Sequence, residues 1–373
     1  MNSSYLNTNL RKLPNLDFEV TEKDFERVDI QQINRTDQVV GKPSKYLVDI
    51  LKRFVSNKWA VVFTIIFLLI IILAIFAPII SNALGYSAYN PVYSGDVSLI
   101  MNLPPRLFHG TYPTITIYNA TPSMIQSYQQ AGVLVGTPVA IIQGVAYKVT
   151  YSPYLYDQLK NIYPILGTDG SGVDIWTKLW TSTQISLGLA FVVSIASIIL
   201  GVSYGAIAGA FAGKAVDTVM MRFIEIINGV PTIVWLLILG VVLSGSDGTT
   251  AVTLNNTTLA ISLIFVLWFS PAISTRTYIM KNKDVEYVQA TKTLGGSQAR
   301  IIFLHMIPVV AGRISVIFVN LIPTVIFYES SLVFLNLKAT SDLGLGVMLY
   351  DSYQVSNVSQ MISPIVVFAS FTI

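Results

Sequence analysis

Long stretches without a charged side chain alternate with shorter polar segments along this chain. An apolar run of about 20 residues is long enough to cross the hydrocarbon core of a bilayer as a helix. The pattern predicts six such helices, at 58–80, 185–210, 229–245, 258–279, 309–329 and 359–373. The last stretch is short, which indicates either a helix that begins before Met361 or a chain that naturally continues past Ile373.

The polar segments divide the chain further. Two stretches in the first long polar region, 114–118 and 146–151, alternate like strands and are separated by glycine and proline, so this region predicts a small mixed or β-rich insert. The fold class expected is therefore an all-α membrane protein with six transmembrane helices and this insert. We expect four parts: a loosely ordered tail at 1–45, the first span with its approach at 46–83, the insert at 84–165, and a five-helix core at 166–373.

Composition supports a membrane location. The 373 residues are 53% hydrophobic and only 12% charged, whereas a soluble globular domain carries about 25% charged residues. Cysteine is absent, so the chain has no disulfide and no thiolate metal site.

The positions of lysine and arginine predict the orientation. Basic residues gather before the first span, between the second and third, and between the fourth and fifth, while the loop 244–256 has none. Because cytoplasmic loops favour lysine and arginine near the ends of spans, both termini are expected in the cytoplasm. The insert then lies on the extracytoplasmic side, and the polar loop 281–308 lies in the cytoplasm.

This polar loop carries the most informative pattern in the chain. Three residues at helical spacing share one face of a short helix that begins at Glu286, two glycines end that helix, and a serine follows that can cap another. A polar helix held between two membrane spans is suited to contact a protein outside the membrane. The residues expected to make or position this contact are Glu286, Tyr287, Ala290, Leu294, Gly295, Gly296, Ser297, Arg300 and Pro308.

Four glycines recur every four residues near the end of the second span, namely Gly201, Gly205, Gly209 and Gly213. On a helix they share one face and let another helix approach closely, so we interpret them as packing residues. The stretch that ends at Lys214 is not a phosphate-binding loop, because alanine stands at both 208 and 215 where glycine and a hydroxyl residue are needed.

No catalytic grouping is recognisable. His109 and His305 each lack a second ligand at metal-binding spacing, which predicts no metal site and no enzyme activity on this chain. Glu225 and Glu329 lie at the edges of spans, where either a functional or a paired structural role is open, with Arg222 as the potential partner of Glu225. Prolines within the apolar stretches, at 231, 271 and 323, are expected to bend their helices.

The polar loop resembles the cytoplasmic coupling loop of ABC importer permeases. Glu286, Ala290, Gly295 and Pro308 match its pattern of Glu-Ala-Ala, Gly and a terminal Pro, and the surrounding residues are similar to the oligopeptide/dipeptide branch. The segments 166–174 and 329–335 resemble two further motifs of the C-type permease of that branch. This chain departs from the family at Val173, where the family has arginine, and at Asn336, where it has glycine, and its insert is longer.

The resemblance implies a permease subunit of an ATP-driven importer for oligopeptides or dipeptides in the plasma membrane of a bacterium. The partners implied are a second permease subunit, two cytoplasmic ATPase subunits and an extracytoplasmic substrate-binding protein, with peptide as substrate and no nucleic acid. ATP and magnesium would be bound by the ATPases, with no cofactor on this chain. The alternatives are a related importer for nickel or another small solute, or a secondary transporter, for which deep carboxylates and matching broken helices are missing.

Overall fold

The protein is described here by a computed structural model, which covers residues 52, 54–142, 145–244, 254–339, 342–355 and 358–372. The chain forms two units, residues 1–61 and 62–373, and the elements below belong to the second apart from the first turn of α4. The predicted tail at 1–45 lies outside the described residues.

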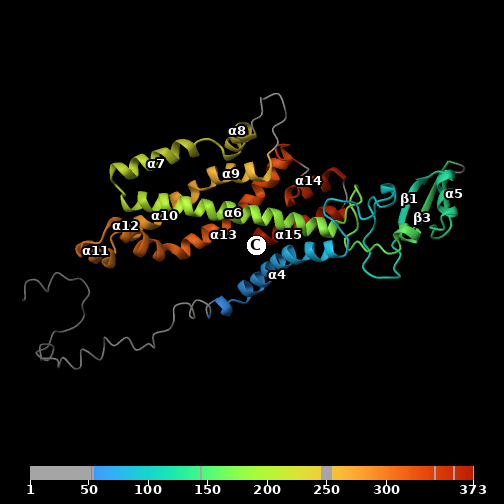
Figure 1. The fold of residues 1–373 in the computed structure, drawn as a ribbon, viewed down its shortest axis with the longest axis horizontal. Coiled ribbons are helices and arrows are strands. Elements are labelled where there is room, and N and C mark those ends of the chain that lie inside the picture. The colour runs from blue at the N-terminus through green and yellow to red at the C-terminus, as the bar shows by residue number, and fades with distance from the viewer. Residues whose placement is uncertain are drawn as a thin grey trace, which may run out of the picture. The chain divides into compact units, whose positions relative to one another are not determined.

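Helices make up most of the second unit (Figure 1). They are α4 (Lys58–Ala83), α6 (Ile175–Ala210), α7 (Ala215–Asn228), α8 (Thr232–Ser244), α9 (Asn256–Leu267), α10 (Phe269–Asn282), α11 (Glu286–Thr293), α12 (Gln298–Arg300), α13 (Ile307–Phe334), α14 (Leu345–Val355) and α15 (Val358–Thr372). A π-helical segment, Ile301–Met306, joins α12 to α13.

Four helices of the described residues are long and apolar enough to cross a membrane: Lys58–Ala83, Ile175–Ala210, Asn256–Asn282 and Gln298–Phe334. A fifth would be the pair α7 and α8, which are bent by 83° at a short break. The sixth expected span corresponds to α15, which has 15 residues and is shorter than the others. The prediction of a mostly helical membrane protein is confirmed, whereas the structure supports four or five spans by length and composition.

Prolines explain where the helices deviate. A proline ring clashes with the carbonyl four residues earlier and donates no hydrogen bond. Pro231 occupies the break between α7 and α8, and Pro271 follows the turn at Trp268 that separates α9 from α10. The π-helical segment lies directly before Pro308, whose ring would otherwise meet the carbonyl of Leu304. Pro323, by contrast, lies within the continuous α13.

Helix α6 is the central element of the bundle. It packs against α9, α10, α13 and α14, and α10 lies alongside its C-terminal half (Figure 1). Asp174 caps its first turn by accepting a hydrogen bond from the backbone N–H of Thr177 at 2.8 Å. With 36 residues α6 is about 54 Å long. Its N-terminal end follows the insert, and Ala206 near its other end joins the cluster that holds α11, so insert and α11 lie at opposite ends.

Three of the four predicted packing glycines lie directly against α10. A Cβ atom at Gly201 would stand 2.6 Å from the carbonyl oxygen of Trp268, one at Gly209 would stand 2.8 Å from that of Arg276, and one at Gly205 would overlap the carbonyl of Ala272. The placement of Gly213 with this group was wrong. It lies beyond the end of α6 with φ +86° and no atom near its missing Cβ, because the helix has already ended at Ala210.

The insert contains a small antiparallel sheet. Its elements are β1 (Ile115–Ala120), α5 (Pro122–Gln130), β2 (Val139–Ile142) and β3 (Ala146–Tyr151), with the strand order β1-β3-β2. The two strand-like stretches of the sequence therefore form the adjacent strands β1 and β3. Three short 3₁₀ turns, Val97–Leu99, Pro153–Leu155 and Asp157–Leu159, flank the sheet.

A buried arginine holds the base of the insert. Arg106 is only 1% exposed, its guanidinium donates a 3.0 Å hydrogen bond to the carbonyl of Lys160, and it lies over the rings of Tyr154 and Tyr163 at 4.8 and 4.6 Å. Burial raises the pKa of the Tyr154 hydroxyl, which therefore stays a neutral donor to the carbonyl of Pro104. Through these contacts Arg106 connects the segment before the sheet to the segment after it, and we call this connected part the base of the insert.

The unusual Asn336 has a conformational explanation. It lies just past the end of α13 with φ +56°, the left-handed region that asparagine adopts more readily than most residues other than glycine. The N–H groups of Asn336 and Leu337 donate to the carbonyls of Val333 and Leu332, both at 2.9 Å, which closes the helix end. Asparagine therefore satisfies the backbone requirement of this position without glycine.

Candidate functional site

Helix α11 is a short, well-capped element at the end of α10. The N–H groups of Gly295 and Gly296 donate to the carbonyls of Lys292 and Thr291, both at 3.0 Å, and Gly295 has φ +78°. This pair of bonds is the Schellman arrangement that ends a helix with a left-handed residue. Ser297 then caps α12 by accepting a hydrogen bond from the N–H of Arg300 at 3.4 Å. The helix–Gly–Gly–helix form expected from the sequence is present.

One buried side chain fastens α11 to the bundle. Val288 is fully buried in a cluster with Ile279 of α10, with Ile301, Ile302 and Met306 of the π-helical segment, and with Ala206 of α6. Apolar side chains packed within about 4 Å of one another resist displacement of one helix relative to its neighbours. A force on α11 is therefore passed to α10, to α13 and to the end of α6.

The opposite face of α11 carries exposed side chains. Leu294 is 88% exposed and Tyr287 is 39% exposed. Of the nine residues predicted to position a partner contact, Gly296 is half-buried and the others are exposed. The exposed residues are Glu286, Tyr287, Ala290, Leu294, Gly295, Ser297, Arg300 and Pro308. The sequence prediction missed Val288, which anchors the helix. It lies beside the predicted face of Tyr287, Ala290 and Leu294 and not on it.

An ion pair braces the same end of the bundle. The guanidinium of Arg276 on α10 donates two hydrogen bonds to the carboxylate of Asp217 on α7, at 2.5 and 2.7 Å. Asp217 also accepts a bond from the N–H of Gly213 at 3.2 Å. The turn after α6 is thereby tied to the helix that leads into α11. Sequence spacing gave no signal for this pair, because 59 residues separate its partners.

The two carboxylates at span edges are both paired. Glu225 accepts from Arg222 at 2.7 Å on an exposed surface, as expected. Glu329 on α13 and Lys338 form a fully buried ion pair with a 2.5 Å contact. Removing one member of such a pair leaves an unpaired buried charge, so a structural role accounts for Glu329. The described residues contain no group of His, Cys, Asp and Glu side chains that fits a metal ion.

A polar cavity of about 360 Å³ lies beside the two helix breaks. Its wall is formed by the junction of α7 with α8, the junction of α9 with α10, and one face of α13. The polar lining is uncharged and contains hydroxyl and amide groups. These residues are Asn228, Thr232, Ser270, Asn320, Thr324 and Tyr328.

Two family models match parts of the chain. The family model of the binding-protein-dependent transport system inner membrane component matches residues 198–373. A second model, the N-terminal TM domain of oligopeptide transport permease C, matches residues 45–105. The residues between them, including the β-sheet of the insert, lie outside both models.

Relatives match over most of their length. The chain is 46% identical to the oligopeptide transport system permease protein OppC of Mycoplasma pneumoniae, covering 94% of this chain and 92% of that protein. It is 45% identical to the protein of the same name from Mycoplasma genitalium, with the same coverage. It is 29% identical to the dipeptide transport system permease protein DppC of Lactococcus lactis, covering 86% and 84%. The resemblance noted in the sequence is confirmed, and the chain belongs to the family of binding-protein-dependent transport system inner membrane components, in its oligopeptide permease branch.

Proposed function

We propose that this chain is one of two permease subunits of an ATP-driven importer of oligopeptides in a bacterial plasma membrane. The names of the relatives support the substrate class, and the exposed, anchored α11 supports the use of an external energy source. In this proposal two cytoplasmic ATPase subunits bind ATP and magnesium, and a second permease subunit completes the path. The chain itself transmits motion and catalyses no reaction.

The polar cavity beside the helix breaks supplies a wall for the substrate path. Uncharged hydroxyl and amide groups can donate to and accept from the backbone of any peptide, whatever its side chains. A charged lining would select among peptides by their net charge. The lining by Asn320, Thr324 and Tyr328 therefore favours transport of peptides of varied sequence.

The proposal also includes an orientation of the chain in the membrane. If α11 docks on the ATPases, its end of α6 is cytoplasmic and the insert, at the other end, is extracytoplasmic. The lysine and arginine pattern of the sequence supports this orientation, in which we expect both termini in the cytoplasm. In this proposal the chain has a tail at 1–45, the first span at 46–83, an external dock at 84–165 and the permease core at 166–373.

The observation that carries the proposal is the 88% exposure of Leu294 at the tip of an anchored helix. Replacing Leu294 by aspartate is expected to reduce the ATPase retained on the purified permease pair at least about tenfold, because a charge would be desolvated in the docking groove. The measurement is quantitative co-purification in detergent, followed by ATP-dependent peptide uptake in proteoliposomes.

Val145→Asp is the matched control, because Val145 is 63% exposed and lies in the insert at the opposite end of α6. It should retain the ATPases fully. Equal retention by the Leu294 and Val145 variants would show that α11 is not the docking element.

The insert offers a separate test of the binding-protein dock. The hydroxyl of Ser152 donates to the carbonyl of Pro113 at 2.9 Å, so residues 114–151 begin and end side by side. Excising them and joining Pro113 to Ser152 removes the sheet but keeps the base around Arg106. Uptake supported by the binding protein should fall about tenfold or more, while basal ATP hydrolysis and ATPase retention stay unchanged. If the shortened chain and the full chain had equal affinity for the binding protein, the sheet would not be part of the docking surface.

A further inference from the structure

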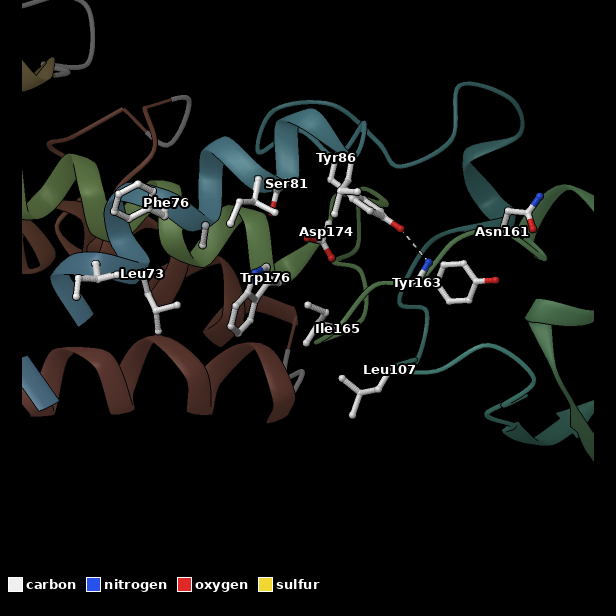
Figure 2. A pocket seen from close by; sticks show the side chains of 14 residues that line it. Leu73, Phe76, Ser81, Tyr86, Leu107, Asn161, Tyr163, Ile165, Asp174 and Trp176 are labelled. Carbon is white, nitrogen blue, oxygen red and sulfur yellow. Dashed lines mark hydrogen bonds between the residues drawn. The ribbon is translucent and has the colours of Figure 1, made fainter. Parts of the chain in front are cut away.

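A cavity of about 730 Å³ lies between the second half of α4 and the start of α6 (Figure 2). Apolar side chains line it from Ile72 of α4 to Leu84, directly after the end of α4, and Trp176 of α6 lines it from the other side. Ile72 and Leu84 are about 18 Å apart along the helix axis. One wall is therefore an apolar strip with the length of a lipid acyl chain.

Three polar side chains gather toward one end of the cavity. Tyr86, Tyr163 and Asp174 lie there, and Figure 2 shows them gathered beyond Ser81, away from Leu73. The hydroxyl of Tyr86 accepts a hydrogen bond from the N–H of Tyr163 at 2.9 Å. A hydroxyl that accepts can still donate, so Tyr86 can offer its proton to an anionic oxygen.

Asp174 has an unsatisfied oxygen at this polar end. The residue is only 3% exposed, and its Oδ2 atom accepts from the N–H and the hydroxyl of Thr177 at 2.8 and 2.5 Å. Its Oδ1 atom is buried and accepts no hydrogen bond from the part of the chain that the structure describes. A buried carboxylate oxygen without a donor is costly, so Oδ1 is open to a donor from outside the chain.

The nearest basic residue along the chain does not supply this donor. Lys178, one turn into α6, binds Asp169 at 3.0 Å and Asp351 at 3.1 Å instead. Among the described residues, no lysine or arginine forms an ion pair with Asp174. Burial raises the pKa of the Asp174 carboxyl, against opposing hydrogen bonds from Thr177 and from the backbone of Trp176, and a cation beside the carboxyl would favour its ionised form. The polar end of the cavity therefore has the chemistry to receive a cation.

We infer that this cavity binds one phospholipid with a primary ammonium headgroup. Its acyl chain lies along α4 from Leu84 to Ile72, its ammonium donates to Oδ1 of Asp174, and its phosphate accepts from the hydroxyl of Tyr86. The apolar strip and the anionic end satisfy both parts of such a molecule. A quaternary ammonium has no N–H group and cannot make the first of these bonds.

Trp176 provides a direct readout because it lines the cavity. The assembled transporter is placed in nanodiscs containing phosphatidylethanolamine with brominated acyl chains, and quenching of tryptophan emission is measured. A Trp176→Phe variant identifies the part of the signal that comes from this residue. Phosphatidylcholine with the same brominated chains is the comparison.

Quenching of Trp176 should reach half its maximum at about a tenfold lower mole fraction of the ethanolamine lipid than of the choline lipid. Asp174→Asn should abolish this preference, because the amide keeps an oxygen for the Thr177 cap but loses the charge. Asp157→Asn changes another aspartate of the same chain, an exposed one outside the cavity, and should leave the preference intact.

Equal quenching by the two lipids in the unaltered protein would overturn the headgroup assignment. Absence of any Trp176-dependent quenching would show that lipid does not enter, and that a protein segment or another molecule fills the cavity. A preference that survives Asp174→Asn would also exclude Asp174 as the group that recognises the ammonium. Melting temperatures of the variants in detergent would show that each is folded.

Discussion

Replacing Gly205 by alanine is expected to destabilise the membrane bundle, although alanine is normally the better helix former. A Cβ atom at this position would overlap the backbone carbonyl of Ala272 on α10, and a backbone carbonyl cannot move aside as a side chain can. Helices α6 and α10 would have to separate, at a cost of about 1–3 kcal/mol or more. The measurement is the melting temperature of the detergent-solubilised complex, together with the yield of monodisperse protein.

Gly188 is the matched control on the same helix. It is exposed, no atom lies within 4 Å of its missing Cβ, and α6 is regular there. Gly188→Ala should therefore stabilise the protein slightly, by about 0.5–1 kcal/mol. Opposite signs for the two substitutions are the expected result. A neutral effect of Gly205→Ala would show that α6 and α10 are not held in close contact in the assembled transporter.

Sequence reasoning succeeded where a local pattern has one physical meaning. Apolar stretches without charge predicted the long helices, glycines every four residues predicted the close approach of α6 to another helix, and Gly295-Gly296 predicted the end of α11. The period of four failed at Gly213 because it continued past Ala210, the last residue of α6. A repeat in the sequence does not report where the helix that carries it ends.

Features that depend on distant residues were not accessible from the sequence. Nothing in the sequence pattern identified Lys338 as the partner of Glu329, yet the two form a buried ion pair. The brace between Asp217 and Arg276 joins α7 to α10, across 59 positions of the sequence. The polar cavity likewise requires two helix breaks and one face of α13 to meet. Each depends on tertiary packing, which single-sequence periodicity does not encode.

The second large effect is expected at Gly295. Replacing it by valine should reduce peptide uptake, although every side chain that faces the ATPase is unchanged. Gly295 has φ +78°, and a β-branched residue in this region costs about 1–2 kcal/mol. The strain would disrupt the bonds from Gly295 and Gly296 to the last turn of α11, and the helix would lose its fixed angle to α12. A penalty of 1.4 kcal/mol corresponds to a tenfold change in an equilibrium, so the docked, force-transmitting arrangement should become about tenfold less populated.

Asparagine at the same position separates backbone strain from the simple presence of a side chain. This chain already places Asn336 at φ +56° in the same kind of helix end. Gly295→Asn should therefore keep at least about half of the uptake, while Gly295→Val loses about nine-tenths of it and hydrolyses more ATP per peptide imported. Uptake and ATP hydrolysis are measured together in proteoliposomes. If valine and asparagine were equally active, the left-handed turn would not matter for coupling. If both were inactive, the partner surface, and not the turn, would exclude any side chain there, and the rigidity argument for Val288 and its cluster would lose its support.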